Sequence, residues 1–222
     1  FILGPFIPRN INRLSFNLKS SKVPIVSPLT SKKIEINNNV FQSIPSVQSQ
    51  RELMFIHVDS LITKDPDPCV MIIYNSSTKK VKDELLKRFP YAELIDTDLT
   101  IGLVDPEITD SLLVEQKNNL VFLESQNLNV ITSVSSLLNS QISKERSINL
   151  LSTYRSETYE NENISYEHLG NLKFTYPSYF FPKYGDELSE LNKLFIENFG
   201  KLPNKIALRG YEITLDLILR TA

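Results

Sequence analysis

The stretch CVMIIY, residues 69–74, decides the fold class of this sequence. Two prolines in the segment KDPDP precede it, and the polar residues NSSTKK follow it. A short apolar run between such signals is typical of a strand that is buried on both faces of a sheet. Strands of that kind belong to parallel sheets, in which crossovers join one strand to the next. We therefore expect residue 69 to open an alternation of strands and helices.

The chain after residue 74 continues this alternation. Further strands are expected at AELID, NLVFLES, INLLST and LKFTYP, and helices at TKKVKDELLKRF and NLNVITSVSSLLNSQI, with a partly helical connection before Gln116. A polar loop and a further helix are expected in the 150s and 160s. About five strands, each with a crossover, predict a doubly wound α/β arrangement with helices on both faces of a mostly parallel sheet.

The N-terminal part contains a shorter α/β pattern. FILGPF, residues 1–6, is expected to be a buried strand, and the helix that begins near Pro8 is expected to place Ile11, Leu14, Phe16 and Leu18 on one face. VPIVSPLT is a second short strand, VFQSIP an extended crossing, and SVQSQRELMFIHVDSLIT a largely buried helix. The segment KDPDP is expected to be a boundary.

Two helices are expected at the C-terminal end. The segment DELSELNKLFIENF, residues 186–199, is amphipathic, with Leu188, Leu191, Leu194 and Phe195 expected to face inward and Gly200 to end the helix. The last helix begins near Pro203, and its apolar residues cover most of its circumference. We expect this helix either to be sandwiched or to lack a partner.

Composition excludes several classes of protein. The 222 residues are 41% hydrophobic and 23% charged, with a net charge of −2, so the chain is a globular protein without a basic surface for nucleic acid. The single cysteine, Cys69, excludes an internal disulfide and a multi-thiolate metal site, and is interpreted as a small buried side chain.

Motifs for catalysis and for cofactors are missing from the sequence. It holds six glycines and neither a GxGxxG nor a Walker motif, and its two histidines, His57 and His168, lack HExxH spacing. Asp96 and Asp98 follow a strand and are either an acid or metal pair or a solvated loop with Asx turns. The aromatic segment TYPSYFFPKY, residues 175–184, either lines a ligand cavity or interface or packs on the core.

Three segments together carry a resemblance to a known family. FILGPF with VPIVSPLT resembles the first-lobe signature of type I periplasmic solute-binding proteins, of the branched-chain amino-acid receptor type. VFQSIPSVQSQRELM resembles the crossing into the second lobe, and FGKLPNKIALRGYEITLDLILRTA resembles the helix that returns to the first lobe. The ending is also similar to that of Bacteroidetes-type envelope proteins that join this fold to LysM peptidoglycan-binding repeats.

The resemblance implies two lobes that close on a ligand by a hinge motion. It implies a partial first lobe at 1–45, a Rossmann-like second lobe at 46–202 and a returning helix at 203–222. FILGPF would then be a late strand of a lobe that begins upstream, so the chain would be a central section of a larger protein with an exposed or neighbour-covered sheet edge. The implied ligand residues are Ser27, Leu29, Thr30 and Ser31 on lobe one, beside the loop of Gly4, Pro5 and Phe6, and Asn75, Ser76, Glu124, Ser125, Tyr154 and Arg155 on lobe two.

Two departures from the family bear on function. Amino-acid receptors usually follow the first lobe-two strand with an acidic residue and a Tyr-Gly pair, where this chain has NSSTKK, and GPFIPRN replaces a run of Ser and Thr. The first hypothesis is a non-catalytic binding protein of the periplasm or cell envelope, with an amino-acid, peptide or muropeptide ligand. The second is an envelope lipoprotein that binds a protein of peptidoglycan synthesis or remodelling. A third is an α/β enzyme with a site near Asp96 or Glu124. No cofactor or metal is expected, and the incomplete lobe one is a potential dimer contact.

Overall fold

The computed structural model describes residues 1–32, 34–35, 37–100, 103–179 and 189–221, without the side chains of residues 99, 100 and 221. The chain divides into two compact units, and each is described by itself. Unit 1 comprises residues 1–49 and 179–222, and unit 2 comprises residues 50–178. The sequence-based boundaries at residues 45 and 202 differ from this division, and the assignment of two lobes stays a prediction. Both units combine helices with parallel strands, which confirms the α/β class.

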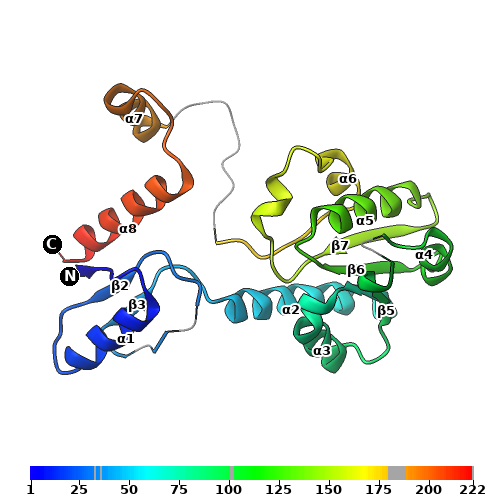
Figure 1. The fold of residues 1–222 in the computed structure, drawn as a ribbon, viewed down its shortest axis with the longest axis horizontal. Coiled ribbons are helices and arrows are strands. Elements are labelled where there is room, and N and C mark those ends of the chain that lie inside the picture. The colour runs from blue at the N-terminus through cyan, green and yellow to red at the C-terminus, as the bar shows by residue number, and fades with distance from the viewer. Residues whose placement is uncertain (33, 36, 101–102, 180–188, 222) are drawn as a thin grey trace. The chain divides into compact units, whose positions relative to one another are not determined.

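Unit 2 includes all but the first three residues of the helix α2, which spans Val47–Lys64. Its elements are, in chain order, β4 (Cys69–Tyr74), η1 (Ser76–Thr78), α3 (Lys79–Arg88), β5 (Glu93–Asp96), η2 (Thr97–Thr100), α4 (Pro106–Leu112), β6 (Asn118–Glu124), α5 (Leu128–Ser140), β7 (Ser147–Leu151), η3 (Glu157–Glu160) and α6 (Tyr166–Asn171). The strands form one parallel sheet in the order β5-β4-β6-β7 (Figure 1). The expected strands 69–74, 92–96, 119–125 and 148–153 are thus present.

Alternate residues of the central strands face two separate cores. Met71 and Ile73 lie in a core with residues of α5 and α6, whereas Val70 and Ile72 lie in a core with residues of α2 and α3. Figure 1 shows α5 and α2 on opposite faces of this sheet. Because full burial of one such side chain contributes roughly 1.5–3 kcal/mol, the continuous apolar runs of β4 and β6 account for much of the stability of unit 2.

The strand expected at LKFTYP, residues 172–177, is reduced to a single bridge. Thr175 pairs in parallel with Leu151, and Leu150 donates its backbone N–H to the carbonyl of Leu172 at 2.9 Å. Lys173, two residues after the end of α6, adopts a positive φ of 49°. This left-handed residue turns the chain, so the regular ladder of β7 does not continue into a fifth strand.

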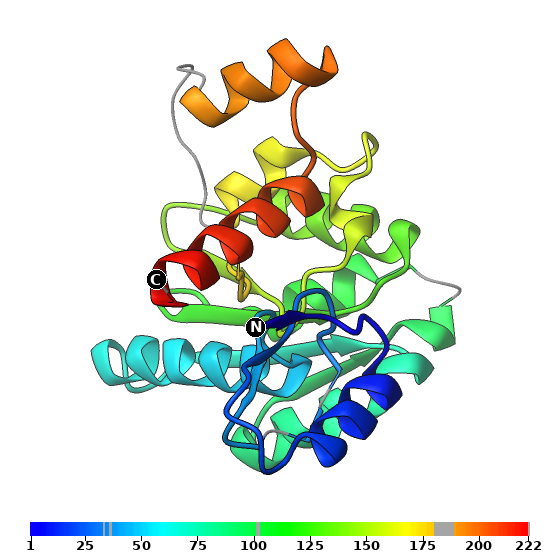
Figure 2. The ribbon, with the colours of Figure 1, turned by 90° about the vertical axis from the view of Figure 1, so that its left-hand side faces the viewer.

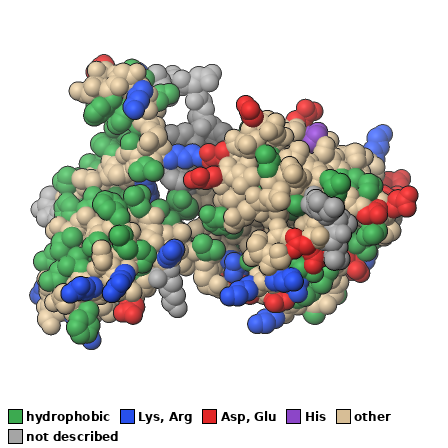
Figure 3. Space-filling model, in the orientation of Figure 1, with side chains coloured by type: hydrophobic (Ala, Val, Ile, Leu, Met, Phe, Trp, Pro, Cys, Tyr) green, Lys and Arg blue, Asp and Glu red, His purple; other side chains and the backbone are tan. Residues whose placement is uncertain are grey.

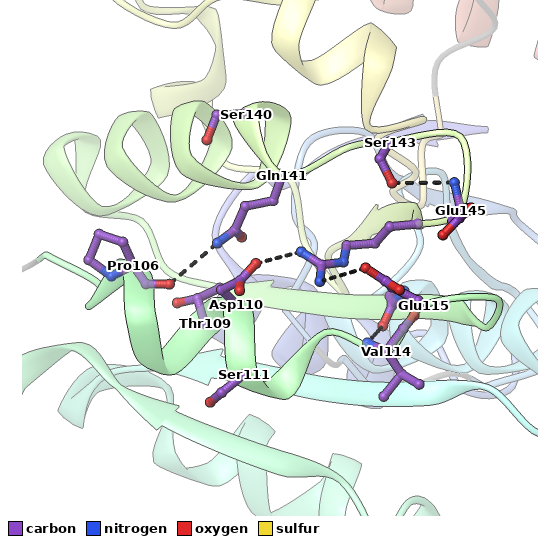
Figure 4. A network of polar contacts seen from close by, with 12 residues as sticks. Pro106, Thr109, Asp110, Ser111, Val114, Glu115, Ser140, Gln141, Ser143 and Glu145 are labelled. Atoms are coloured by element: carbon purple, nitrogen blue, oxygen red, sulfur yellow. Dashed lines mark hydrogen bonds and ion pairs between the residues drawn. The ribbon is translucent and has the colours of Figure 1, made fainter.

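An ion-pair network fixes the amino-terminal ends of the strands in unit 2. The Arg146 guanidinium, just before β7, contacts the Asp110 carboxylate of α4 at 2.5 Å and that of Glu115 at 3.7 Å. Gln141 donates to the carbonyl of Pro106 at 3.3 Å, and Figure 4 shows these groups converging on one side of α4. The network holds α4 in place at the end of the sheet opposite to the candidate site described below.

Unit 1 contains a smaller sheet. Its elements are β1 (Ile2–Leu3), α1 (Pro8–Asn17), β2 (Ile25–Ser27), β3 (Val40–Gln42), α7 (Glu190–Phe199) and α8 (Lys205–Thr221). The three strands are parallel in the order β1-β2-β3. One core joins Ile11 of α1 to Ile25 and Val40, and another joins Val26 to Ile213 and Leu217 of α8. Figure 2 shows α1 and α8 on opposite sides of the strands.

Several sequence-based expectations for unit 1 are wrong. FILGPF is not a fully buried strand, because β1 is two residues long, pairs with β2 at the edge of the described sheet and leaves Leu3 exposed. Phe16 was expected on the buried face of α1 but is 77% exposed, since the sheet covers a narrow stripe of that helix. Leu194 of α7 is also exposed, and Leu188 lies outside the described residues.

The last helix, α8, is covered along one stripe. Ile213 and Leu217 are buried against Val26, and Arg209 donates to the carbonyl of Ser43 at 2.5 Å. The large apolar side chains of α8 that remain exposed are Ile206, Tyr211, Leu215, Ile218 and Leu219. The structure thus shows one covered stripe on α8 and leaves these other apolar side chains accessible to solvent.

Candidate functional site

The strand order of unit 2 defines one end of its sheet as a candidate site. After β4, the chain builds β5 on one side and then crosses to build β6 on the other side. In doubly wound sheets, ligands bind at the carboxyl ends of the strands where such a reversal occurs. The reversal places Asn75 and Ser76, after β4, beside Ser125, after β6. Four of the six residues predicted for the second lobe lie at these two strand ends.

Asn75 organises the turn after β4 and links it to β6. Its Oδ1 accepts hydrogen bonds from the backbone N–H of Ser77 at 3.0 Å and from the Ser77 hydroxyl at 2.6 Å. Thr78 Oγ1 accepts from the Asn75 N–H at 3.1 Å, which completes a reciprocal capping box. The Asn75 amide donates through Nδ2 to the Ser125 hydroxyl at 3.1 Å. Asn75 therefore holds the two strand ends together.

The acidic residues after β5 also fix this turn. Asp98 accepts from the backbone N–H of Ser76 at 2.6 Å, and its own N–H donates to Asp96 Oδ1 at 3.0 Å. Thr97 donates through its hydroxyl to the carbonyl of Tyr74 at 3.1 Å. The hydrogen bond from the Asp98 N–H to Asp96 Oδ1 forms an Asx turn. The sequence had left open an Asx-turn loop or an acid or metal pair at these two residues. Among the described residues, no group of three acidic, histidine or cysteine side chains is placed to hold a metal ion.

Glu124 closes the end of β6 from inside the protein. Its side chain is buried, and its two carboxylate oxygens accept from the backbone N–H of Thr153 at 2.7 Å and from the Thr153 hydroxyl at 2.9 Å. Thr78 donates to its backbone carbonyl at 2.7 Å. Burial raises the pKa of Glu124 to about 7, although the Thr153 hydrogen bonds and the Arg51 charge lower it. Glu124 thus titrates near neutral pH while joining the ends of β6 and β7.

The remaining predicted residues of unit 2 lie beyond β7. Tyr154 is 37% exposed, whereas the Arg155 guanidinium lies over the Tyr176 ring, 5.0 Å from its centroid. Arg155 also pairs with Glu160 at 3.1 Å. Arg155 therefore faces the segment that follows α6 and takes no part in the Asn75–Ser125 contact.

The four residues predicted for lobe one all belong to unit 1. Ser27 is fully buried at the end of β2, and its hydroxyl makes no hydrogen bond within the described residues. The Thr30 hydroxyl accepts from the backbone N–H of Lys32 at 3.2 Å, and the carbonyl of Ser31 accepts from Val47 at 3.3 Å. Leu29 is 42% exposed. These residues shape the loop after the central strand of unit 1.

The neighbouring loop of unit 1 follows β1. Gly4 has a φ of 107°, a conformation that glycine adopts without a steric penalty, and donates its N–H to Val26 at 2.8 Å. Phe6 is 62% exposed. Residues 180–184 of the aromatic segment TYPSYFFPKY lie outside the described residues, whereas Tyr176 packs against Phe174 with ring centroids 5.2 Å apart.

Two side chains at the strand ends were missed by sequence reasoning. Thr78 had a detectable signal, because the spacing Asn75-x-x-Thr78 matches a capping box before the helical segment. Thr153 had none, because its pairing with Glu124 joins residues on separate strands. Cys69, interpreted as a small buried side chain, is half-buried: its thiol donates to the carbonyl of Leu112 at 3.2 Å, and this burial raises its pKa.

No family model, curated protein or solved structure matches the chain. Among the helices of the described residues, none is both long enough and apolar enough to cross a membrane.

Proposed function

We propose that the chain is a non-catalytic ligand-binding protein of the bacterial cell envelope or periplasm, of the type I solute-binding kind. One observation carries the proposal: the strand order reverses between β4 and β6, and polar side chains follow both strands. The resemblance of three segments to solute-binding proteins supports the same class. The proposed ligand is a small polar molecule such as an amino acid, a peptide or a muropeptide.

The groups proposed to contact the ligand are those at the strand ends that remain accessible. Ser76 is exposed, and its hydroxyl makes no hydrogen bond within the described residues, while Asp98 and Asn75 fix its backbone. Tyr154 adds a partly exposed phenol beyond β7. Both are uncharged groups that donate and accept hydrogen bonds, which suits a polar ligand. Glu124 would support the strand ends from below, because Thr153 occupies both of its oxygens.

Calorimetric titration and thermal unfolding test this proposal. Amino acids, dipeptides and muropeptides are added to the whole chain, and the melting temperature should rise with the concentration of the ligand that binds. Ser76→Ala and Tyr154→Phe should each weaken binding several-fold. Ser111→Ala is the matched control, because Ser111 lies on α4, near the opposite end of the sheet (Figure 4). The proposal fails if none of these compounds raises the melting temperature.

A second candidate function is binding to a protein of peptidoglycan synthesis or remodelling. The exposed apolar side chains of α8 favour it, since accessible apolar patches mark interaction sites in soluble proteins. Leu215→Lys would place a charge in this patch without touching the buried Ile213 and Leu217. The wild-type chain should retain an envelope protein that this variant does not retain, and light scattering would show whether the patch instead joins two copies of the chain.

A further inference from the structure

A hollow of about 430 Å³ lies beside α6 in unit 2. Its lining consists of Arg155, Tyr166, Leu169, Gly170, Lys173, Phe174 and Tyr176. Pockets for small molecules range from about 300 to 1,000 Å³, so the hollow has the size of a small-ligand site. None of Asn75, Ser76 and Ser125 lines it, and an inference about it therefore goes beyond the proposed function.

The apolar part of the hollow is built on an aromatic stack. The Phe174 ring stacks on the buried Tyr159 ring with centroids 4.8 Å apart, and Tyr176 packs against Phe174 with centroids 5.2 Å apart. Leu169, which is 6% exposed, belongs to the main core of the unit. Because these side chains are held by the core, the apolar walls exist before any ligand arrives, which lowers the ordering cost of binding.

The turn after α6 brings a cation to the hollow. Lys173 has a φ of 49°, its N–H donates to Gly170 at 3.0 Å, and the N–H of Phe174 donates to Leu169 at 2.9 Å. The Lys173 side chain is exposed and forms no ion pair with any carboxylate of the described residues. The positive charge of Lys173 is thus available to a ligand.

Arg155 supplies a second cation with a fixed orientation. Its guanidinium lies over the Tyr176 ring at 5.0 Å, and one of its nitrogens pairs with Glu160 at 3.1 Å. The lining contains two cations and no carboxylate. Since Glu160 offsets part of the charge of Arg155, the remaining charge is close to that of one cation, which suits a monoanion better than a dianion.

We infer that this hollow binds an organic monoanion, a carboxylate attached to an aromatic or apolar group. The carboxylate would lie between Arg155 and Lys173, and the apolar group would lie against Phe174 and Tyr166. Tyr166 is 60% exposed, so its ring is available to cover such a group. Arginine and tyrosine are also the residue types that most often dominate binding energy at recognition sites.

The test is a titration of the whole chain with two probes that differ in charge alone. N-acetyl-phenylalanine carries the carboxylate, and N-acetyl-phenylalaninamide replaces it with a neutral amide. We expect the acid to bind about tenfold more tightly, a difference of about 1.4 kcal/mol, and its affinity to fall as salt is added. Arg155→Gln and Lys173→Gln should each weaken binding of the acid about threefold or more while leaving the amide unchanged.

Two controls separate a specific loss of binding from a general change in charge and from unfolding. Lys87→Gln removes an exposed lysine on α3, away from the hollow, and should leave the affinity for the acid unchanged. Lys173→Gln changes an exposed residue. If the melting temperature of this variant is unaltered, its loss of binding cannot be ascribed to unfolding. Equal binding of acid and amide, or saturable binding of neither, would overturn the inference. Tighter binding of phenyl phosphate than of the acid would overturn the choice of a carboxylate.

Discussion

Unit 2 and unit 1 use the same kind of strand but bury it to different extents. In unit 2, Met71, Ile72 and Ile73 are inaccessible to solvent because a neighbouring strand lies on each side and helices cover both faces. In unit 1, β2 alone has two neighbouring strands, and Phe1, Phe6 and Phe41 remain exposed. Figure 3 shows many hydrophobic side chains on the surface of unit 1. An apolar run therefore predicts a strand, whereas burial depends on how many strands and helices surround it.

The largest expected effect compares one leucine from each unit. Leu123→Ala removes an inaccessible side chain from the main core of unit 2 and should lower the free energy of unfolding by about 3 kcal/mol. Leu217→Ala in unit 1 should cost about half as much, because Leu217 borders an open groove that solvent can enter. Urea unfolding monitored in both variants checks this order. Equal losses would show that the core of unit 1 is as complete as that of unit 2.

The next effect is a pH dependence confined to unit 2. Burial raises the pKa of Glu124 from 4.5 to about 7, so the folded chain binds more protons than the unfolded chain between these values. The free energy of unfolding should therefore fall as the pH rises through this window, by at most about 3 kcal/mol.

Glu124→Gln tests that pH dependence. The amide keeps an acceptor for Thr153 but has no charge to desolvate, so the variant should lose the slope and exceed the wild type in stability at about pH 8. Urea unfolding at several pH values measures this difference. Glu157→Gln, at an exposed carboxylate, should retain the wild-type slope. An unchanged slope in Glu124→Gln would mean that another group titrates.

A smaller effect compares two arginines that tie elements together. Arg146 contacts Asp110 and Glu115 in unit 2 (Figure 4), whereas Arg209 contacts the Ser43 carbonyl and Glu212 in unit 1. Arg146→Gln should cost about 1–2 kcal/mol and Arg209→Gln about 1 kcal/mol, since hydrogen bonds to charged groups contribute about 1.5–3 kcal/mol and exposed ion pairs much less. Unfolding at low and high salt measures both. A larger loss for Arg209→Gln would reverse the comparison.

The smallest effect concerns the helix caps. Asn127 accepts from the N–H of Asn129 at 2.9 Å and caps α5, whereas Ser189 accepts from that of Asn192 at 3.3 Å and caps α7. Asn127→Ala should cost about 1 kcal/mol, because α5 buries five residues in the core. The described α7 buries none, so Ser189→Ala should act locally, as faster amide exchange within α7. A global loss from Ser189→Ala would contradict this distinction.

Most elements of unit 2 could be predicted from the sequence because local patterns encode them. The apolar runs of β4 and β6, and the two prolines before β4, identify those strands without knowledge of their neighbours. The exposed Phe16 shows that a local pattern does not predict burial, because the apolar stripe of α1 is wider than the sheet that it covers. The prediction of a strand at LKFTYP was wrong because Lys173 turns the chain. No sequence pattern in that segment indicates that a lysine adopts a left-handed conformation.

The candidate site could be predicted in position but not in its contacts. Glu124 ends β6, and Asn75, Ser76 and Ser125 follow strands, so their place at the carboxyl end follows from a parallel sheet. The sequence could not show that Glu124 points inward, since this depends on Thr153 arriving from the next strand with two donors. Arg155 also turns toward Tyr176, a partner more than one element away along the chain.

The bridge between Leu151 and Thr175 has a consequence for aggregation. Thr175 donates its N–H to the carbonyl of Leu150 and accepts from the N–H of Ser152. These two backbone groups on the outer side of β7 are therefore already hydrogen-bonded. The opposite edge, β5, carries the charged Glu93 and Asp96, which disfavour pairing with a foreign strand. Unit 2 therefore protects one sheet edge with its own chain and the other with charge, two devices that allow a sheet to stay monomeric at high concentration.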